Sequence, residues 1–175
     1  MIFKGVFDLE PIKNDSVRYT RLKMASALGG IAVFLIYFIF SLQYKIPMYL
    51  SDETAYMTKA AAIAGYPTDM ASSWYAGYPL LLAPLFWIFS DPFVIWKGVM
   101  FLNALMFGAS FAILFYLMVY IFPDKSIKQI LTAVAVSALY PAFISMSGYS
   151  FATPGFILCF MPAPVAQQYN DAGGL

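Results

Sequence analysis

The stretch GVMFLNALMFGASFAILFYLMVYIFP, residues 98–123, decides the structural class of this protein. Its 26 residues carry no charge, because the flanking charged residues are Lys97 and Asp124. The hydrocarbon core of a bilayer is about 30 Å thick and needs roughly 20 apolar residues in a helix. Lipid offers no partner to a bare backbone N–H or C=O, so such a segment must be helical. The stretch therefore predicts a membrane-spanning helix over residues 98–122.

Two other uncharged segments predict further spans. No charge lies between Lys23 and Lys45, and none lies between residues 129 and 170. These segments predict spans over residues 24–43 and 127–147. The whole chain agrees, with 62% hydrophobic and 11% charged residues, whereas soluble domains carry about 25% charged residues. The sequence thus predicts an all-α integral membrane protein with three transmembrane helices.

The rare residue types exclude several chemistries. There is no histidine, which removes Ser–His and Cys–His nucleophilic pairs and histidine-ligated metals. Cys159 is the only cysteine, so no disulfide can form within the chain. Any acid–base chemistry falls to carboxylates, lysine or tyrosine. The net charge of +1 gives no indication of a nucleic-acid partner.

The distribution of basic residues predicts the orientation. Half of the ten basic residues precede the first span, namely Lys4, Lys13, Arg18, Arg21 and Lys23. The positive-inside rule makes residues 1–23 a cytoplasmic tail of a multi-pass protein of the cell membrane. Residues 44–97 then form an extracytoplasmic loop, and residues 123–126 form a cytoplasmic turn.

Two juxtamembrane helices are predicted in the loop. The first covers residues 51–64, with Ser51 or Asp52 as a cap and Gly65 followed by Pro67 as a stop. The second, YPLLLAPLFWIF at 78–89, would be about 18 Å long, which is shorter than the bilayer core.

The placement of residues 78–89 leaves two alternatives open. The segment lies in the membrane interface, or it joins residues 70–77 and spans. The interfacial alternative puts seven of the ten basic residues inside, and the spanning alternative puts six inside. The positive-inside rule therefore favours the interface by one residue.

The first loop helix carries several polar groups on one face. Asp52, Tyr56, Lys59 and Ile63 follow a spacing of i, i+4, i+7 and i+11. A carboxylate, a phenol and an ammonium group would then point together at the membrane surface. The same spacing is also explained if Asp52 only caps the helix and Lys59 only extends into solvent. The pattern alone therefore leaves open whether these groups form a functional site.

Three short stretches of this loop carry a family resemblance. SDETAY at 51–56, GYP at 65–67 and WYAGYPLLLAPLF at 74–86 resemble the first loop of polytopic C-type glycosyltransferases. These enzymes take a sugar from a polyprenyl-phosphate donor, and relatives include the protein O-mannosyltransferases and the aminoarabinose transferase of lipid A. The likeness extends over residues 24–148 and supports an interfacial position for the second loop helix.

The resemblance implies roles for a few residues. Asp52 matches the acid of the family's loop, which acts as a general base or a metal-assisted activator of the acceptor, and Glu53 is the fallback. Tyr56 would shape the substrate-facing side of the helix. Lys59 is the local cation that could face the phosphate of the polyprenyl-phosphate sugar.

A divalent metal, Mg²⁺ or Mn²⁺, is the one cofactor that this interpretation allows. Asp69 could join Asp52 as a ligand, although an acid in the turn after Pro67 is the commoner occurrence. Within the second span, Asn103, Gly108 and Ser110 suit close helix packing.

The chain also departs from the family pattern. Residues 147–152 contain no acid, where relatives often place one, and residues 153–175 lose the hydrophobic pattern abruptly. We expect an irregular tail over 148–175, as in a truncated or frameshifted product, and no transferase activity from this chain alone. The alternative is a small non-catalytic membrane subunit that packs against a larger partner among membrane lipids. A transporter fragment is a weaker option, because the predicted spans contain no ionisable residue.

Overall fold

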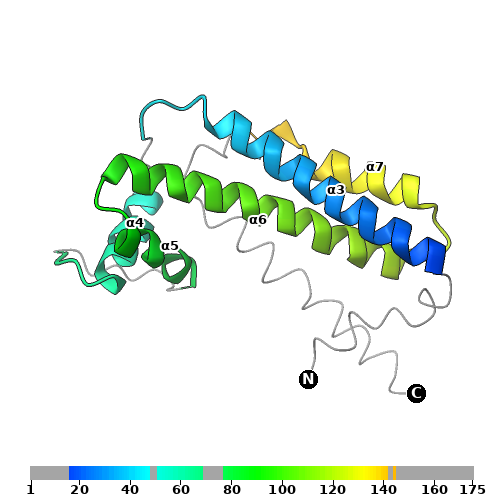
Figure 1. The fold of residues 1–175 in the computed structure, drawn as a ribbon, viewed down its shortest axis with the longest axis horizontal. Helices are drawn as coiled ribbons and strands as arrows, with labels where there is room; N and C mark the ends of the chain where they lie inside the picture. Colours follow the sequence, from blue (N-terminus) through cyan, green and yellow to red (C-terminus); the bar gives the residue numbers. More distant parts are fainter. Residues whose placement is uncertain (1–15, 48–50, 69–76, 142–143, 145–175) are drawn as a thin grey trace, which may run out of the picture.

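The computed structural model describes residues 16–47, 51–68, 77–141 and 144. This part of the chain is all-α and contains five helices: α3 (Ser16–Ser41), α4 (Ser51–Ile63), α5 (Gly77–Ile88), α6 (Pro92–Ile121) and α7 (Ile127–Ala138). In Figure 1, α3, α6 and α7 lie side by side, and α4 and α5 gather at the end where α6 begins.

Two of the five helices are long and apolar enough to cross a membrane. They are the segments Thr20–Ser41 of α3 and Pro92–Ile121 of α6, each with a mean hydropathy of 2.1. This property rests on length and composition alone. α5 and α7 are apolar but have only 12 residues each.

The third predicted span, over 127–147, is not confirmed. α7 begins at Ile127 as expected, but its described helix ends at Ala138. Most of the residues from 142 to 147 lie outside the described part, as do residues 1–15 and 148–175, to which the tail predictions refer. Among the described residues, two helices rather than three are therefore long and apolar enough to cross a membrane.

α6 begins six residues before the span that the charge pattern predicts. Asp91 caps the helix, and its Oδ1 accepts hydrogen bonds from the N–H groups of Phe93 at 2.7 Å and Val94 at 3.3 Å. Pro92 occupies the first turn, where its missing N–H has no cost. As a consequence, Lys97 belongs to α6 rather than to the loop before it.

The other helix ends follow ordinary capping rules. Ser126 and Gln129 form a reciprocal capping box at the start of α7. Gly65 follows α4 with a φ of 95°, a left-handed conformation that favours glycine at a helix end. The predicted stop of the first loop helix is therefore confirmed.

α3 and α6 run in opposite directions and touch at a pair of glycines (Figure 1). A Cβ atom added to Gly30 would lie 2.9 Å from the carbonyl oxygen of Gly108. A Cβ atom added to Gly108 would lie 2.7 Å from the carbonyl oxygen of Gly30. Small residues allow such close backbone approach between apolar helices. The predicted packing role of Gly108 is thus confirmed.

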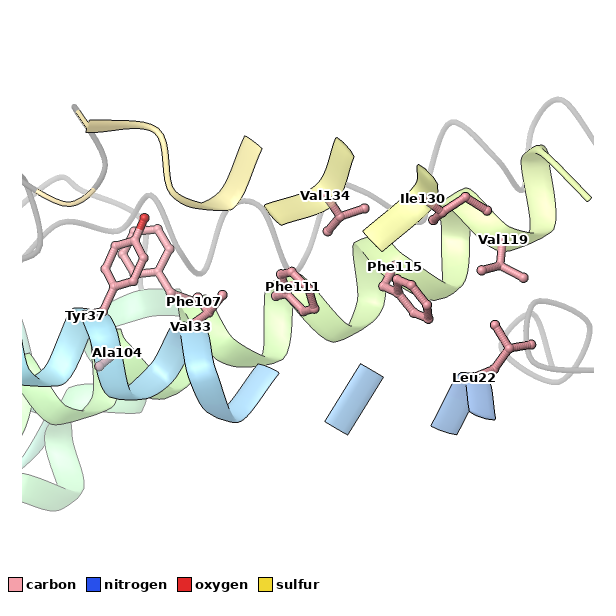
Figure 2. Packing of buried hydrophobic residues seen from close by; sticks show 10 residues of the cluster. All are labelled: Leu22, Val33, Tyr37, Ala104, Phe107, Phe111, Phe115, Val119, Ile130 and Val134. Atoms are coloured by element: carbon pink, nitrogen blue, oxygen red, sulfur yellow. The ribbon is translucent and has the colours of Figure 1, made fainter. Parts of the chain in front are cut away.

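A chain of buried side chains continues this contact along the helices (Figure 2). The cluster combines residues of α3, α6 and α7: Leu22, Val33, Tyr37, Ala104, Phe107, Phe111, Phe115, Val119, Ile130 and Val134. Tyr37 stacks on Phe107 at a centroid distance of 4.1 Å, and its hydroxyl donates to the carbonyl oxygen of Ala138 at 2.6 Å. The phenol thereby satisfies a carbonyl in the last turn of α7, the part of a helix in which carbonyl groups commonly need partners from outside it.

We predict that Gly108→Ala destabilises the α3–α6 pair by about 1–3 kcal/mol, because the new methyl group must push two backbones apart. Thermal unfolding in detergent micelles, followed by circular dichroism, measures the loss. Gly77→Ala is the matched control, since a Cβ atom there meets nothing within 4 Å. Equal stability of the two variants would contradict the close contact.

Candidate functional site

Four of the predicted site residues, Asp52, Glu53, Tyr56 and Lys59, belong to α4, which lies in the group of helices at one end of the molecule. α4 packs on α5, and α5 packs on the N-terminal half of α6. Their shared core consists of Ala60, Tyr78, Leu82, Val99 and Met106. Two side chains also tie the ends of α4 and α5 together. The Tyr66 hydroxyl donates to the carbonyl oxygen of Phe86, and Trp87 Nε1 donates to that of Ala64, both at 3.2 Å.

Glu53 is the most deeply buried acid of the described chain, with only 1% of its surface exposed. Acidic side chains are almost never fully buried, and when they are, a specific environment compensates. It lies on the same face of α4 as Tyr56, Met57 and Ala60, which pack toward α5 and α6. The structure therefore places the second predicted acid inside the helix group.

The other two predicted acids lie outside the described part. The backbone of Asp52 belongs to the first turn of α4, but its side chain is not described. Asp69 falls within residues 69–76, which are also outside it. The proposed pairing of these two carboxylates at a metal thus stays a prediction.

Tyr56 and Lys59 are both partly buried. The Tyr56 ring meets the Tyr78 ring of α5 edge to face, with a centroid distance of 5.4 Å and an interplanar angle of 88°. Tyr56 is therefore part of the packing between α4 and α5, so a role in shaping this face is consistent with its position. The role of Lys59 toward a phosphate stays a prediction.

Asn103 is a buried amide inside α6, with 1% of its surface exposed. The Tyr78 hydroxyl donates a hydrogen bond of 2.8 Å to its Oδ1 atom, and both atoms are buried. The sequence predicted a packing role for Asn103 and Ser110, and both are buried in the structure. Asn103 adds a specific polar contact that fixes α5 on α6. In this way Tyr56, Tyr78 and Asn103 connect the face of α4 that carries Glu53 to the long apolar helix α6.

Lys97 is a feature that the sequence analysis missed. Its Nζ atom donates to the carbonyl oxygen of Tyr44 at 2.7 Å, just beyond the end of α3. The same ammonium lies 4.6 Å from the ring centroid of Trp96 and 5.5 Å from that of Phe93. The Asp91-Pro92 start signal could have revealed it, because it places Lys97 one helical turn after Phe93.

No three histidine, cysteine or acidic side chains of the described residues come together as a metal site. The possible ligands Asp52 and Asp69 are not described there.

Comparisons with family models, with curated proteins and with solved structures found no match. The likeness to C-type glycosyltransferases consequently depends on the three short sequence stretches of the first loop.

We predict that Tyr78→Phe and Asn103→Leu each lower the free energy of unfolding by about 1 kcal/mol, because each removes the buried hydrogen bond between the two side chains. The double variant should lose less than the sum of the two single losses, as expected for a direct contact. Unfolding of all four proteins in the same detergent gives this double-mutant cycle. Strict additivity would contradict the buried hydrogen bond.

Proposed function

We propose that this chain forms the membrane portion of a glycosyltransferase, which moves a sugar from a polyprenyl-phosphate donor to an acceptor on the extracytoplasmic side. The observation that supports this function best is the placement of Glu53. An acidic residue of the DETAY stretch is buried on the face of α4 that packs toward α5 and α6. A lipid-linked substrate needs its reacting groups at this kind of position, next to the membrane surface.

The proposed reaction needs one carboxylate. Asp52, or Glu53 as the fallback, takes the proton of the acceptor hydroxyl. The acceptor oxygen then forms a bond to the anomeric carbon of the sugar. The bond between that carbon and the phosphate oxygen breaks, and the lipid phosphate leaves with the electron pair. A cation near the leaving phosphate stabilises the charge that develops there.

We also propose how the helices are arranged in the cell membrane. α3 and α6 are two of three spans, and α7 begins the third. The N-terminus is cytoplasmic, because five basic residues precede the first span. α4 and α5 lie at the outer surface as juxtamembrane helices. The 12-residue length of α5, about 18 Å, supports an interfacial position for it.

We predict that single cysteines report this topology in a Cys159→Ser background. Lys45→Cys should react with a membrane-impermeant maleimide in intact cells, because Lys45 is exposed after the end of α3. Lys125→Cys, exposed in the turn between α6 and α7, should react only after permeabilisation. The reverse labelling pattern would overturn the orientation. Labelling of both residues in intact cells would show that the chain between them crosses the membrane an even number of times, as it would if residues 70–89 spanned in addition to α6.

We predict that the Asp52→Asn, Glu53→Gln double variant lowers sugar transfer by a factor of about 10² to 10⁴, the contribution of a general base. The assay uses membranes from the native host with the substitutions in the chromosomal gene, so that any partner chain is present. Transfer of radiolabelled sugar from extracted polyprenyl-phosphate lipids is measured. The single variants then assign the base.

Asp124→Asn is the control, since this exposed acid lies in the turn between α6 and α7, away from α4. It should transfer sugar at the unmodified rate. Undiminished transfer by the double variant would contradict the proposal. If the same chain also co-purified with a larger membrane protein, a non-catalytic subunit would be the better description.

A further inference from the structure

Lys97 is a half-buried cation whose described neighbours carry no compensating charge. Its ammonium contacts the Tyr44 carbonyl oxygen and the rings of Trp96 and Phe93, all of which are neutral. Among the residues that the structure describes, no carboxylate forms an ion pair with it. Asp91, the acid nearest to it along α6, is engaged by the backbone N–H groups of the first turn.

Such an environment is favourable for binding an anion. Removing an ammonium group from water costs free energy unless a charge or strong hydrogen bonds compensate. The ring faces and one carbonyl oxygen recover part of this cost. An incoming anion would recover more, because charge-assisted hydrogen bonds are about twice as strong as neutral ones.

The ammonium also has the donors for a ligand. A lysine carries three N–H donors, and one of them is used on Tyr44. The carbonyl oxygen and the two rings fix the position of Nζ, so binding would cost little additional side-chain entropy. This pre-arrangement distinguishes Lys97 from Lys45, which is exposed at the same end of the molecule.

We propose that Lys97 binds the phosphate group of a membrane lipid. Its position supports this ligand, because Lys97 lies within the second turn of α6, at the end where α4 and α5 gather (Figure 1). Gly98, the next residue, faces Leu85 of α5. The choice of a lipid phosphate over other anions rests on the proposed function. Lys97 would then be a cation for the leaving phosphate, a role for which the sequence offered only Lys59.

Amine footprinting tests this proposal on the unmodified protein. The purified chain in neutral maltoside micelles is acetylated with and without dodecyl phosphate, and the lysine-containing peptides are quantified by mass spectrometry. At about ten times the dissociation constant, bound ligand should slow the acetylation of Lys97 about tenfold, because protection follows 1 + [L]/Kd. Acetylation of Lys45 in the same sample should not change. Equal effects on both lysines, or no effect, would overturn the proposal.

Two further ligands identify the source of the phosphate. Inorganic phosphate at the same concentration should not protect Lys97, since it lacks the chain that concentrates the ligand at the membrane. Equal protection by inorganic phosphate would overturn the lipid part of the proposal. Farnesyl phosphate, which has a prenyl chain, should protect at least as well as dodecyl phosphate.

Variants provide a second measurement. Dodecyl phosphate should raise the unfolding temperature of the unmodified protein, of Lys97→Arg and of Lys45→Gln, but not that of Lys97→Gln. A similar rise in Lys97→Gln would contradict the assignment. If Lys97→Gln does not fold, the footprinting of the unmodified chain alone decides whether Lys97 binds the lipid phosphate.

This outcome is separable from that of the transfer assay. If dodecyl phosphate protects Lys97 but the Asp52 and Glu53 variants transfer sugar normally, the phosphate site is supported and the proposed transferase function is contradicted. If those variants lose transfer but dodecyl phosphate does not protect Lys97, only the phosphate site at Lys97 is contradicted.

Discussion

The contact between the backbones of Gly30 and Gly108 is the constraint on which the arrangement of the other helices depends. Apolar side chains give little preference for one helix partner over another inside lipid, so close packing decides which faces meet. With no side chains at this crossing, each glycine carbonyl lies within 3 Å of the position that a Cβ atom would take on the other. The register of α3 against α6 is therefore set there. The aromatic side chains on either side then fill the remaining space.

Polar contacts connect other parts of the chain to the α3–α6 pair. Tyr37 reaches a carbonyl at the end of α7, and Lys97 reaches one just after α3. Tyr78 reaches the amide of Asn103 and so joins α5 to α6. Each bond satisfies a group that an apolar environment would leave without water. The helix group that contains Glu53 is held on the long helices by contacts of this kind together with its apolar core.

The helices themselves could be predicted well from the residues. α4 and α5 lie within one residue of the predicted ranges, because the stop at Gly65 and the apolar run after Gly77 are local signals. Asp91-Pro92 is the start signal of α6, whereas the predicted span over 98–122 begins six residues later. Charge was used as the boundary, whereas the physical boundary is the cap at Asp91 with Pro92 behind it. A lysine at the membrane surface does not end a helix, since its long side chain can reach a polar partner.

The sequence by itself determined that the chain is helical and that two of its segments are long and apolar enough to cross a membrane. Composition and length suffice for this, because lipid leaves a backbone no other way to satisfy its polar groups. It also identified the acids of the first loop as candidates. Only the tertiary structure decided that Glu53 is buried and that Lys97 donates to the carbonyl oxygen of Tyr44. Both properties depend on segments that meet only in the folded chain, and residues far apart in the sequence leave no local pattern that predicts such contacts.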